Sequence, residues 1–323
     1  MQQLFPFADY WWLYAVFTGA VLGLLALDLG VFHRKPHQVT FREAAAWSAV
    51  WISLALLFNL TLYLYTLWTF PEYARQVALE FLSGYLVEYS LSVDNIFVFV
   101  LILGYFAVPL RYQHRVLFYG ILGALMFRGA FIALGAVLMR FHWVVLVFGV
   151  FLIFTGIHMA LSSGQAVQPE RNFVIRAVRR FFPVTHELSD HRFFVKKGGR
   201  TWATPLLAAL LCLEASDIVF AIDSVPAIFA LTREPFVVFS SNVFAILGLR
   251  SLYFMLGGAV ERFHLLRYGL AAVLVFVGLK MVWLDEWFGG RFPIGVSLVV
   301  IGSMLAISVW LSLMFPKRHP AQS

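Results

Sequence analysis

Nine stretches of this 323-residue chain are each long and apolar enough to cross a lipid bilayer. A spanning helix needs about 20 mostly apolar residues to cross a hydrocarbon core of about 30 Å. Because 61% of the residues are hydrophobic and only 13% are charged, lipid is the expected solvent. The predicted spans are Trp11–Phe32, Glu43–Thr66, Val77–Phe106, Val116–Met139, Val144–Ser162, Thr204–Leu231, Phe236–Leu256, Tyr268–Leu284 and Pro293–Phe315. The sequence therefore predicts an all-α, polytopic membrane helix bundle that has the lipid bilayer as a partner.

The Lys and Arg residues of the connecting segments predict the orientation of the chain. When the connections are assigned alternately to the two sides of the membrane, one side carries 17 of the 24 Lys and Arg residues and the other carries 4. By the positive-inside rule, the richer side faces the cytosol. We therefore expect a plasma (inner) membrane protein with its N-terminus outside and its C-terminus in the cytosol. Since these segments explain the net charge of +7, no nucleic-acid partner is expected.

The spans and connections divide the chain into five predicted parts. Residues 1–75 hold two N-terminal spans, 76–162 hold three spans, 163–203 form a basic cytosolic loop, 204–290 hold three more spans, and 291–323 hold the last span and a short basic tail. The loop carries eight Lys or Arg residues. We interpret it as a solvated linker near the lipid headgroups, with a docking site for anionic lipid or a regulator as the alternative.

Nine ionisable side chains fall near the middle of the predicted spans, where each costs about 2.5 to 3.5 kcal/mol. They are Asp28, Glu88, Asp94, Arg128, Glu214, Asp217, Asp223, Arg250 and Lys280. Six acids against three bases leave an excess of negative charge, which favours a cation as the ligand. The alternative is that Asp94 or Asp223 pairs with a buried arginine and only joins helices. Lys280 is interpreted as a counter-ion or a snorkelling side chain.

Two groups of three spans carry similar motifs. The third span contains Glu88-Tyr89-Ser90 and the sixth contains Glu214-Ala215-Ser216, and each is followed one span later by a Gly-rich stretch that ends in an arginine. Because the copies are three spans apart, they must enter the membrane from opposite sides. This pattern predicts a 3+3 inverted repeat, with a substrate site near the bilayer midplane where the two copies meet.

The spacing of the acids predicts broken helices. Glu88 and Asp94 are six positions apart, about 240° around a helix, so they face one point only if the helix opens between them. Asp223 lies shortly before Pro226, which disfavours regular helix. Opened backbone would add carbonyl oxygens to the carboxylates, and such oxygen ligands suit hard cations. From the residues alone, Mn²⁺, Ca²⁺ and Mg²⁺ all remain candidates.

The predicted site contains six metal ligands and six supporting residues. The metal ligands are Glu88, Asp94, Asn95, Glu214, Asp217 and Asp223, and the supporting residues are Asp28, Arg128, Asn242, Arg250, Ser90 and Ser216. The metal is expected as a transported substrate, and no prosthetic group is expected. An enzyme is not expected, because the sequence has no pair of metal-binding His residues and no nucleophile elbow, and its single cysteine, Cys212, is expected to pack as a small apolar residue.

Four motifs carry a resemblance to a known family. They are Ser92-Val93-Asp94-Asn95-Ile96-Phe97-Val98, Tyr119-Gly120-Ile121-Leu122-Gly123-Ala124 with Arg128, the segment from Glu214 to Ala227, and the segment from Ser241 to Arg250. Together they resemble the TerC family of integral membrane proteins, including its Alx-type members, over nearly the whole chain. The resemblance implies export of Mn²⁺ from the cytosol, a link to pH response, kinship with LysE-like exporters and an association with tellurite resistance. It also assigns ion handling to Asp94, Asn95, Glu214, Asp217 and Asp223.

These observations favour one function and leave an alternative. The favoured function is a transporter in which buried carboxylates alternate between a divalent metal ion, Mn²⁺ first, and protons. The alternative is a membrane scaffold or assembly factor, linked to metal or tellurite stress, that does not transport. Tellurite itself is an oxyanion, so it fits poorly with an excess of buried negative charge.

Overall fold

The computed structural model describes residues 3–27, 39–139, 141–161, 193–197, 200–256, 263, 265–288 and 292–315. Within these ranges, nine helices are long and apolar enough to cross a membrane, which confirms the predicted helix bundle. They are α1 (Phe7–Leu27), α2 (Phe41–Thr69), α3 (Ala74–Tyr105), α4 (Leu110–Leu138), α5 (His142–Leu161), α7 (Pro205–Phe229), α8 (Pro235–Leu256), α9 (Leu266–Leu279) with its continuation, and α11 (Ile294–Met314).

Local sequence signals set several of the helix ends. Thr40 caps α2, because its hydroxyl accepts a hydrogen bond from the backbone N–H of Glu43 at 3.3 Å. Pro205 begins α7, where its missing N–H costs nothing. The helix α9 continues through a π-helical turn, η5 (Lys280–Leu284), into the short α10 (Asp285–Trp287), so the three elements form one span.

The helices α3 and α7 are both unbroken, so the prediction that they open near the buried acids is wrong. An unpaired backbone N–H or C=O in lipid costs several kcal/mol, which favours continuous helices. Pro226 lies three residues before the end of α7, so the hydrogen bond that it removes belongs to the last turn. The site must therefore be built from side chains.

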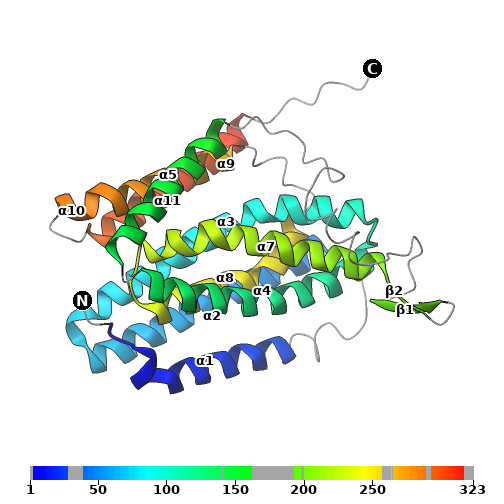
Figure 1. The fold of residues 1–323 in the computed structure, drawn as a ribbon, viewed down its shortest axis with the longest axis horizontal. Coiled ribbons are helices and arrows are strands. Elements are labelled where there is room, and N and C mark those ends of the chain that lie inside the picture. The colour runs from blue at the N-terminus through cyan, green and yellow to red at the C-terminus, as the bar shows by residue number, and fades with distance from the viewer. Residues whose placement is uncertain are drawn as a thin grey trace.

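The spanning helices form two groups (Figure 1). In the main bundle, α3 packs along α8, α4 packs along α7, and α2 packs against both α3 and α8. In the second group, α9 lies between α5 and α11, and this group is set obliquely to the main bundle in Figure 1. Contacts of α11 with α3 and of α5 with α7 join the two groups.

The pairing of helices bears on the predicted repeat. A twofold axis that exchanges α3, α4 and α5 with α7, α8 and α9 would convert the α3–α8 contact into the α7–α4 contact, and both contacts are extensive. It would also bring α5 onto α9, which is the closest pair in the second group. The packing is compatible with the inverted repeat, which stays a prediction.

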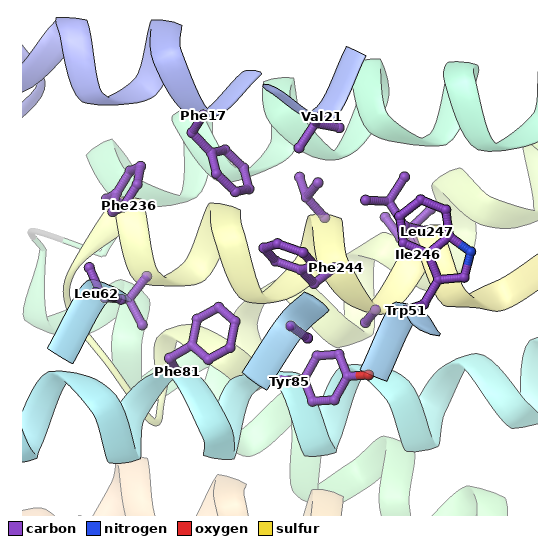
Figure 2. Packing of buried hydrophobic residues seen from close by; sticks show 14 of the residues in the cluster. Phe17, Val21, Trp51, Leu62, Phe81, Tyr85, Phe236, Phe244, Ile246 and Leu247 are labelled. Atoms are coloured by element: carbon purple, nitrogen blue, oxygen red, sulfur yellow. The ribbon is translucent and has the colours of Figure 1, made fainter. Parts of the chain in front are cut away.

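An aromatic core fills the main bundle beside α1 and α2 (Figure 2). Phe17 and Val21 point inward from α1, Phe81 and Tyr85 point toward them from α3, and Phe244 of α8 lies between the two pairs. Phe17 is 5% exposed and Phe81 is 0% exposed. Side chains of this size hold α1 in place even though its backbone makes few close approaches to the other helices.

The segment before α1 is fixed by a distant residue. The carboxylate of Glu234, in the α7–α8 connection, accepts hydrogen bonds from the backbone N–H groups of Leu4 at 2.8 Å and Phe5 at 3.3 Å. The Phe5 ring is fully buried, with edge contacts to Tyr10 and Phe236. Residues 3–5 are therefore part of the folded bundle.

The end of the predicted basic loop contains a hairpin that the sequence analysis did not identify. Strands β1 (Phe194–Lys197) and β2 (Arg200–Ala203) pair antiparallel, with Lys197 opposite Arg200. The Gly198-Gly199 pair between them is a recognised signal for a two-residue hairpin connection. The rest of the loop, from 163 to 192, lies outside the described residues.

The helices α5 and α9 approach closely because glycines line their contact. A Cβ atom on Gly278 would lie 2.6 Å from the backbone oxygen of Gly149, and a Cβ atom on Gly156 would lie 2.7 Å from the backbone oxygen of Ala271. Small residues allow this approach, and close packing is what drives helix association in lipid.

We expect Gly278→Ala to destabilise the protein by about 1 to 3 kcal/mol, because the new methyl group meets backbone that cannot move aside. Unfolding in detergent micelles measures the change. Gly104→Ala on α3 is the control, since a Cβ atom there has no neighbour within 4 Å. Equal stability of Gly278→Ala and the wild type would contradict the close contact.

Candidate functional site

Arg128 lies at the centre of a polar cluster inside the main bundle. It is 1% exposed and belongs to α4. Its guanidinium forms an ion pair with Glu88 of α3, and its Nη2 atom lies 3.5 Å from Oδ1 of Asp217 on α7. Its Nη1 atom also donates to Ser224 Oγ at 3.0 Å and to Asn242 Oδ1 at 2.8 Å. Four helices, α3, α4, α7 and α8, therefore meet at one side chain.

The two carboxylates of this cluster are incompletely satisfied. Glu88 is 0% exposed and Asp217 is 4% exposed. Each uses one oxygen toward Arg128, while Oε2 of Glu88 and Oδ2 of Asp217 are buried without a hydrogen-bond donor among the described residues. A buried carboxylate oxygen without a partner costs free energy, so both atoms are available to a further proton or cation.

Glu214 lies on α7, one helical turn before Asp217, and is the third acid near Arg128. Its carboxylate lies directly against Gly123 of α4, so closely that a Cβ atom on Gly123 would overlap it. Its Oε2 atom is also buried without a hydrogen-bond donor in the described part of the chain. The glycine of the motif that precedes Arg128 therefore makes room for an acid.

The structure brings together only part of the predicted ligand set. Glu88, Asp217 and the supporting residues Arg128 and Asn242 meet, with Glu214 one turn away. Asp223 is half-buried on another face of α7 and makes no hydrogen bond or ion pair with a described residue. It was also predicted as the alternative partner of a buried arginine, and this prediction is wrong for Arg128, which pairs with Glu88.

The remaining predicted residues lie outside the cluster or outside the described part. Asn95 is 5% exposed on α3 and makes no hydrogen bond to Arg128. Ser90 and Ser216 each donate to a backbone oxygen of their own helix, at 2.6 Å and 2.8 Å. Arg250 lines a pocket described below. Asp28 and the side chain of Asp94 lie outside the described residues.

Ser224 is a member of the cluster that the sequence analysis missed. It follows Asp217 by seven residues, a spacing that places two side chains on the same face of a helix. This spacing was available in the sequence. The cluster thus has a carboxylate, a hydroxyl and an amide oxygen in addition to Glu88.

The described carboxylates alone do not form a metal site in this conformation. Among the residues that the structure describes, no three His, Cys, Asp or Glu side chains lie close enough to hold a metal ion. A metal at the cluster would therefore need the neutral oxygens of Ser224 and Asn242 as well as the two carboxylates. Hard cations accept such mixed oxygen ligands.

A small pocket lies on one side of the cluster, with about 20 Å³ of free space, enough for about one water molecule. Asp217, Arg250, Gly120 and Ala124 are among its lining residues, and most of the others are apolar. The pocket extends toward the start of α4 and as far as Phe99 on α3. Both of these lie toward the side of the membrane that is predicted to be cytosolic. We call it the inner pocket.

A wider recess, with about 860 Å³ of free space, opens at the other end of the main bundle. It is lined by the α2–α3 and α7–α8 connections, the end of α9 and the start of α11. Its charged lining residues have both signs and are Glu72, Arg75, Glu80, Arg233, Glu234, Lys280 and Asp285. We call it the outer recess, because it lies on the side predicted to be extracytoplasmic.

Buried polar contacts hold the α7–α8 connection at the floor of the outer recess. Lys280 of the π-helical turn is 4% exposed, donates to the backbone oxygen of Ala230 at 2.5 Å and lies 4.0 Å from Asp285. Thr232 donates to the carboxylate of Glu80 on α3. The Arg128 cluster therefore lies between the inner pocket and a recess whose floor is held by polar contacts.

Comparison with known proteins gives one family and close relatives. The model of the integral membrane protein TerC family matches residues 73–320. The uncharacterized membrane protein STKORF319 of Myxococcus xanthus is 51% identical over 321 residues, which cover 99% of this chain and 97% of the relative. Alx of Escherichia coli (strain K12), whose name describes a candidate membrane-bound redox modulator, is 44% identical over 317 residues, covering 96% and 97%. No solved structure matches.

Proposed function

Since the chain belongs to the TerC family of integral membrane proteins, we propose that it is a transporter that exports a divalent cation from the cytosol, with Mn²⁺ as the preferred ion. The cation would pass through the Arg128 cluster, and protons would move in the opposite direction. We place the chain in the plasma membrane with its N-terminus outside and its C-terminus in the cytosol, on the distribution of Lys and Arg.

One observation carries the proposal. Buried carboxylate oxygens of Glu88, Asp217 and Glu214 have no hydrogen-bond donor among the described residues, and they lie between a pocket on one side and a recess on the other. Acids inside a membrane bundle are costly and typically mark ion or proton pathways. A buried polar cluster between an internal pocket and an open recess fits a transporter whose site opens to one side at a time.

The choice of Mn²⁺ rests on ligand chemistry and on the family resemblance. The cluster offers carboxylate, amide and hydroxyl oxygens, which suit Mn²⁺, Mg²⁺ and Ca²⁺ and do not favour soft metals. The single cysteine, Cys212, is 0% exposed in α7, so one copy of the chain has no second thiol for dithiol exchange. The name of the Alx relatives therefore does not by itself assign thiol chemistry to this chain.

Metal flux into vesicles tests the proposal. We expect full-length protein in proteoliposomes to carry Mn²⁺ across the membrane, with Mg²⁺ and Ca²⁺ slower. Asp217→Asn and Glu214→Gln should each lower the Mn²⁺ rate by at least about tenfold, the loss typical of a changed metal ligand environment. Glu286→Gln is the control, because Glu286 is an exposed acid that lines neither the inner pocket nor the outer recess.

Two results would contradict the proposal. One is a Mn²⁺ flux that does not exceed that of empty vesicles, which would favour a scaffold without transport. The other is a flux that Asp217→Asn and Glu214→Gln leave unchanged, which would mean that the cation passes elsewhere.

A further inference from the structure

We propose that Arg128 is a tethered cation that occupies the binding site of the transported ion and is displaced when that ion binds. The proposal rests on the proposed function and adds that Arg128 competes with the transported ion for the same site. Three oxygen atoms from three helices surround the Nη1 atom of Arg128, namely Oε1 of Glu88, Oγ of Ser224 at 3.0 Å and Oδ1 of Asn242 at 2.8 Å. The nitrogen thus lies where oxygen ligands for a hard cation converge.

The orientation of the Asn242 amide is set independently of the arginine. The amide nitrogen of Asn242 donates to the backbone oxygen of Val238 at 2.9 Å, which turns its Oδ1 atom toward the cluster. Asn242 and Ser224 are 0% and 2% exposed, so other side chains pack around both of them. The cluster therefore presents oxygens to any cation that enters it, and preorganised ligands of this kind favour binding.

Arg128 fills this position incompletely. An arginine frequently binds one carboxylate with two parallel N–H groups. Here Nη1 contacts Glu88, whereas Nη2 lies 3.5 Å from the carboxylate of Asp217. The Nε atom of Arg128, Oε2 of Glu88 and Oδ2 of Asp217 are all buried without a hydrogen-bond partner among the described residues. Arg128 compensates the negative charge of the carboxylates but leaves some of their oxygen atoms without a donor. A cation that contacts these oxygens as well can therefore replace it.

A divalent cation has the advantage in this competition. Its attraction to the two carboxylates is twice that of a single positive charge at the same distance. The inner pocket reaches Asp217, so a cation from that side arrives beside the cluster. Glu214, one turn from Asp217 and with an unpartnered oxygen, provides a second anion toward which the displaced guanidinium can turn.

Binding of MnCl₂ to the purified full-length protein in detergent tests the competition. We expect Arg128→Gln to lower the Kd for Mn²⁺ by at least about tenfold, because the internal competitor is gone. A purely structural role for Arg128 predicts the opposite sign, since loss of packing weakens binding. Arg75→Gln is the control for a lost positive charge, as Arg75 is exposed at the outer recess, and its Kd should change by less than about twofold.

Arg128→Lys keeps the test decisive if the glutamine variant does not fold. Its ammonium retains the charge but cannot reach two carboxylates with two nitrogens, so it competes less well and the Kd should fall by at least about threefold. If the wild type binds and transports Mn²⁺ and either Arg128 variant binds it equally or more weakly, the competitor role is overturned and the proposed transport stands. If neither the wild type nor the variants bind Mn²⁺, both proposals are overturned.

Discussion

Glu88→Leu is expected to destabilise the protein by about 3 kcal/mol, the lower end of the cost of removing one member of a buried ion pair, because Asp217 stays 3.5 Å from Arg128. The leucine fills a similar volume, so the loss reflects the charge of Arg128 more than packing. Equilibrium unfolding in mixed detergent micelles measures the change. Ser90→Ala on the same helix should change stability by less than about 1 kcal/mol, because its hydroxyl bonds only to the backbone of α3.

The triple variant Glu88→Leu, Arg128→Met and Asp217→Leu distinguishes the charged cluster from the position, because Arg128 pairs with Asp217 as well as with Glu88. Replacing every member of a buried ion cluster with apolar side chains is often neutral or stabilising, so most of the lost stability should return. A triple variant as unstable as Glu88→Leu alone would show that the position, and not the pairing with Arg128, causes the loss.

Gly123→Ala is expected to reduce Mn²⁺ flux by at least about tenfold with little loss of stability. The new methyl group would overlap the carboxylate of Glu214, which is the end of a flexible side chain and can turn away. The helix packing is then kept while the acid is displaced. Flux into proteoliposomes and thermal unfolding, measured on the same preparation, separate the two effects.

Gly129→Ala is the matched control for Gly123→Ala. It lies on the same helix, does not line the inner pocket, and a Cβ atom there would be 3.8 Å from Phe239 Cε2, an ordinary contact. Flux of Gly123→Ala at the rate of Gly129→Ala would show that the position of Glu214 does not matter for transport.

The sequence predicts the spans well because hydrophobic length is a property of each segment alone. All nine predicted spans overlap a helix of the structure. The partner of Arg128 was not predictable in the same way, because it depends on the rotation and depth of α3 relative to α4. Asp94 lies six residues beyond Glu88 on α3 and Asp223 lies on α7, so the choice among these acids depended on the depth and rotation of both helices relative to α4.

The error over broken helices has a different cause. The spacing of Glu88 and Asp94 was interpreted as if both had to face one point, and an unbroken α3 removes that requirement. The polar floor of the outer recess was also missed. Glu80 and Thr232 are 152 positions apart and meet only because α3 lies beside the α7–α8 connection.

The hydrogen bonds from Leu4 and Phe5 to Glu234 limit when this part of the chain can fold during synthesis. Leu4 and Glu234 are separated by 230 positions, so their hydrogen bond cannot form until α7 has been made and the ribosome has passed residue 234. Until then the Phe5 ring has no Phe236 to pack against. Leu4 and Phe5 thus reach their native contacts only after most of the described bundle has been made.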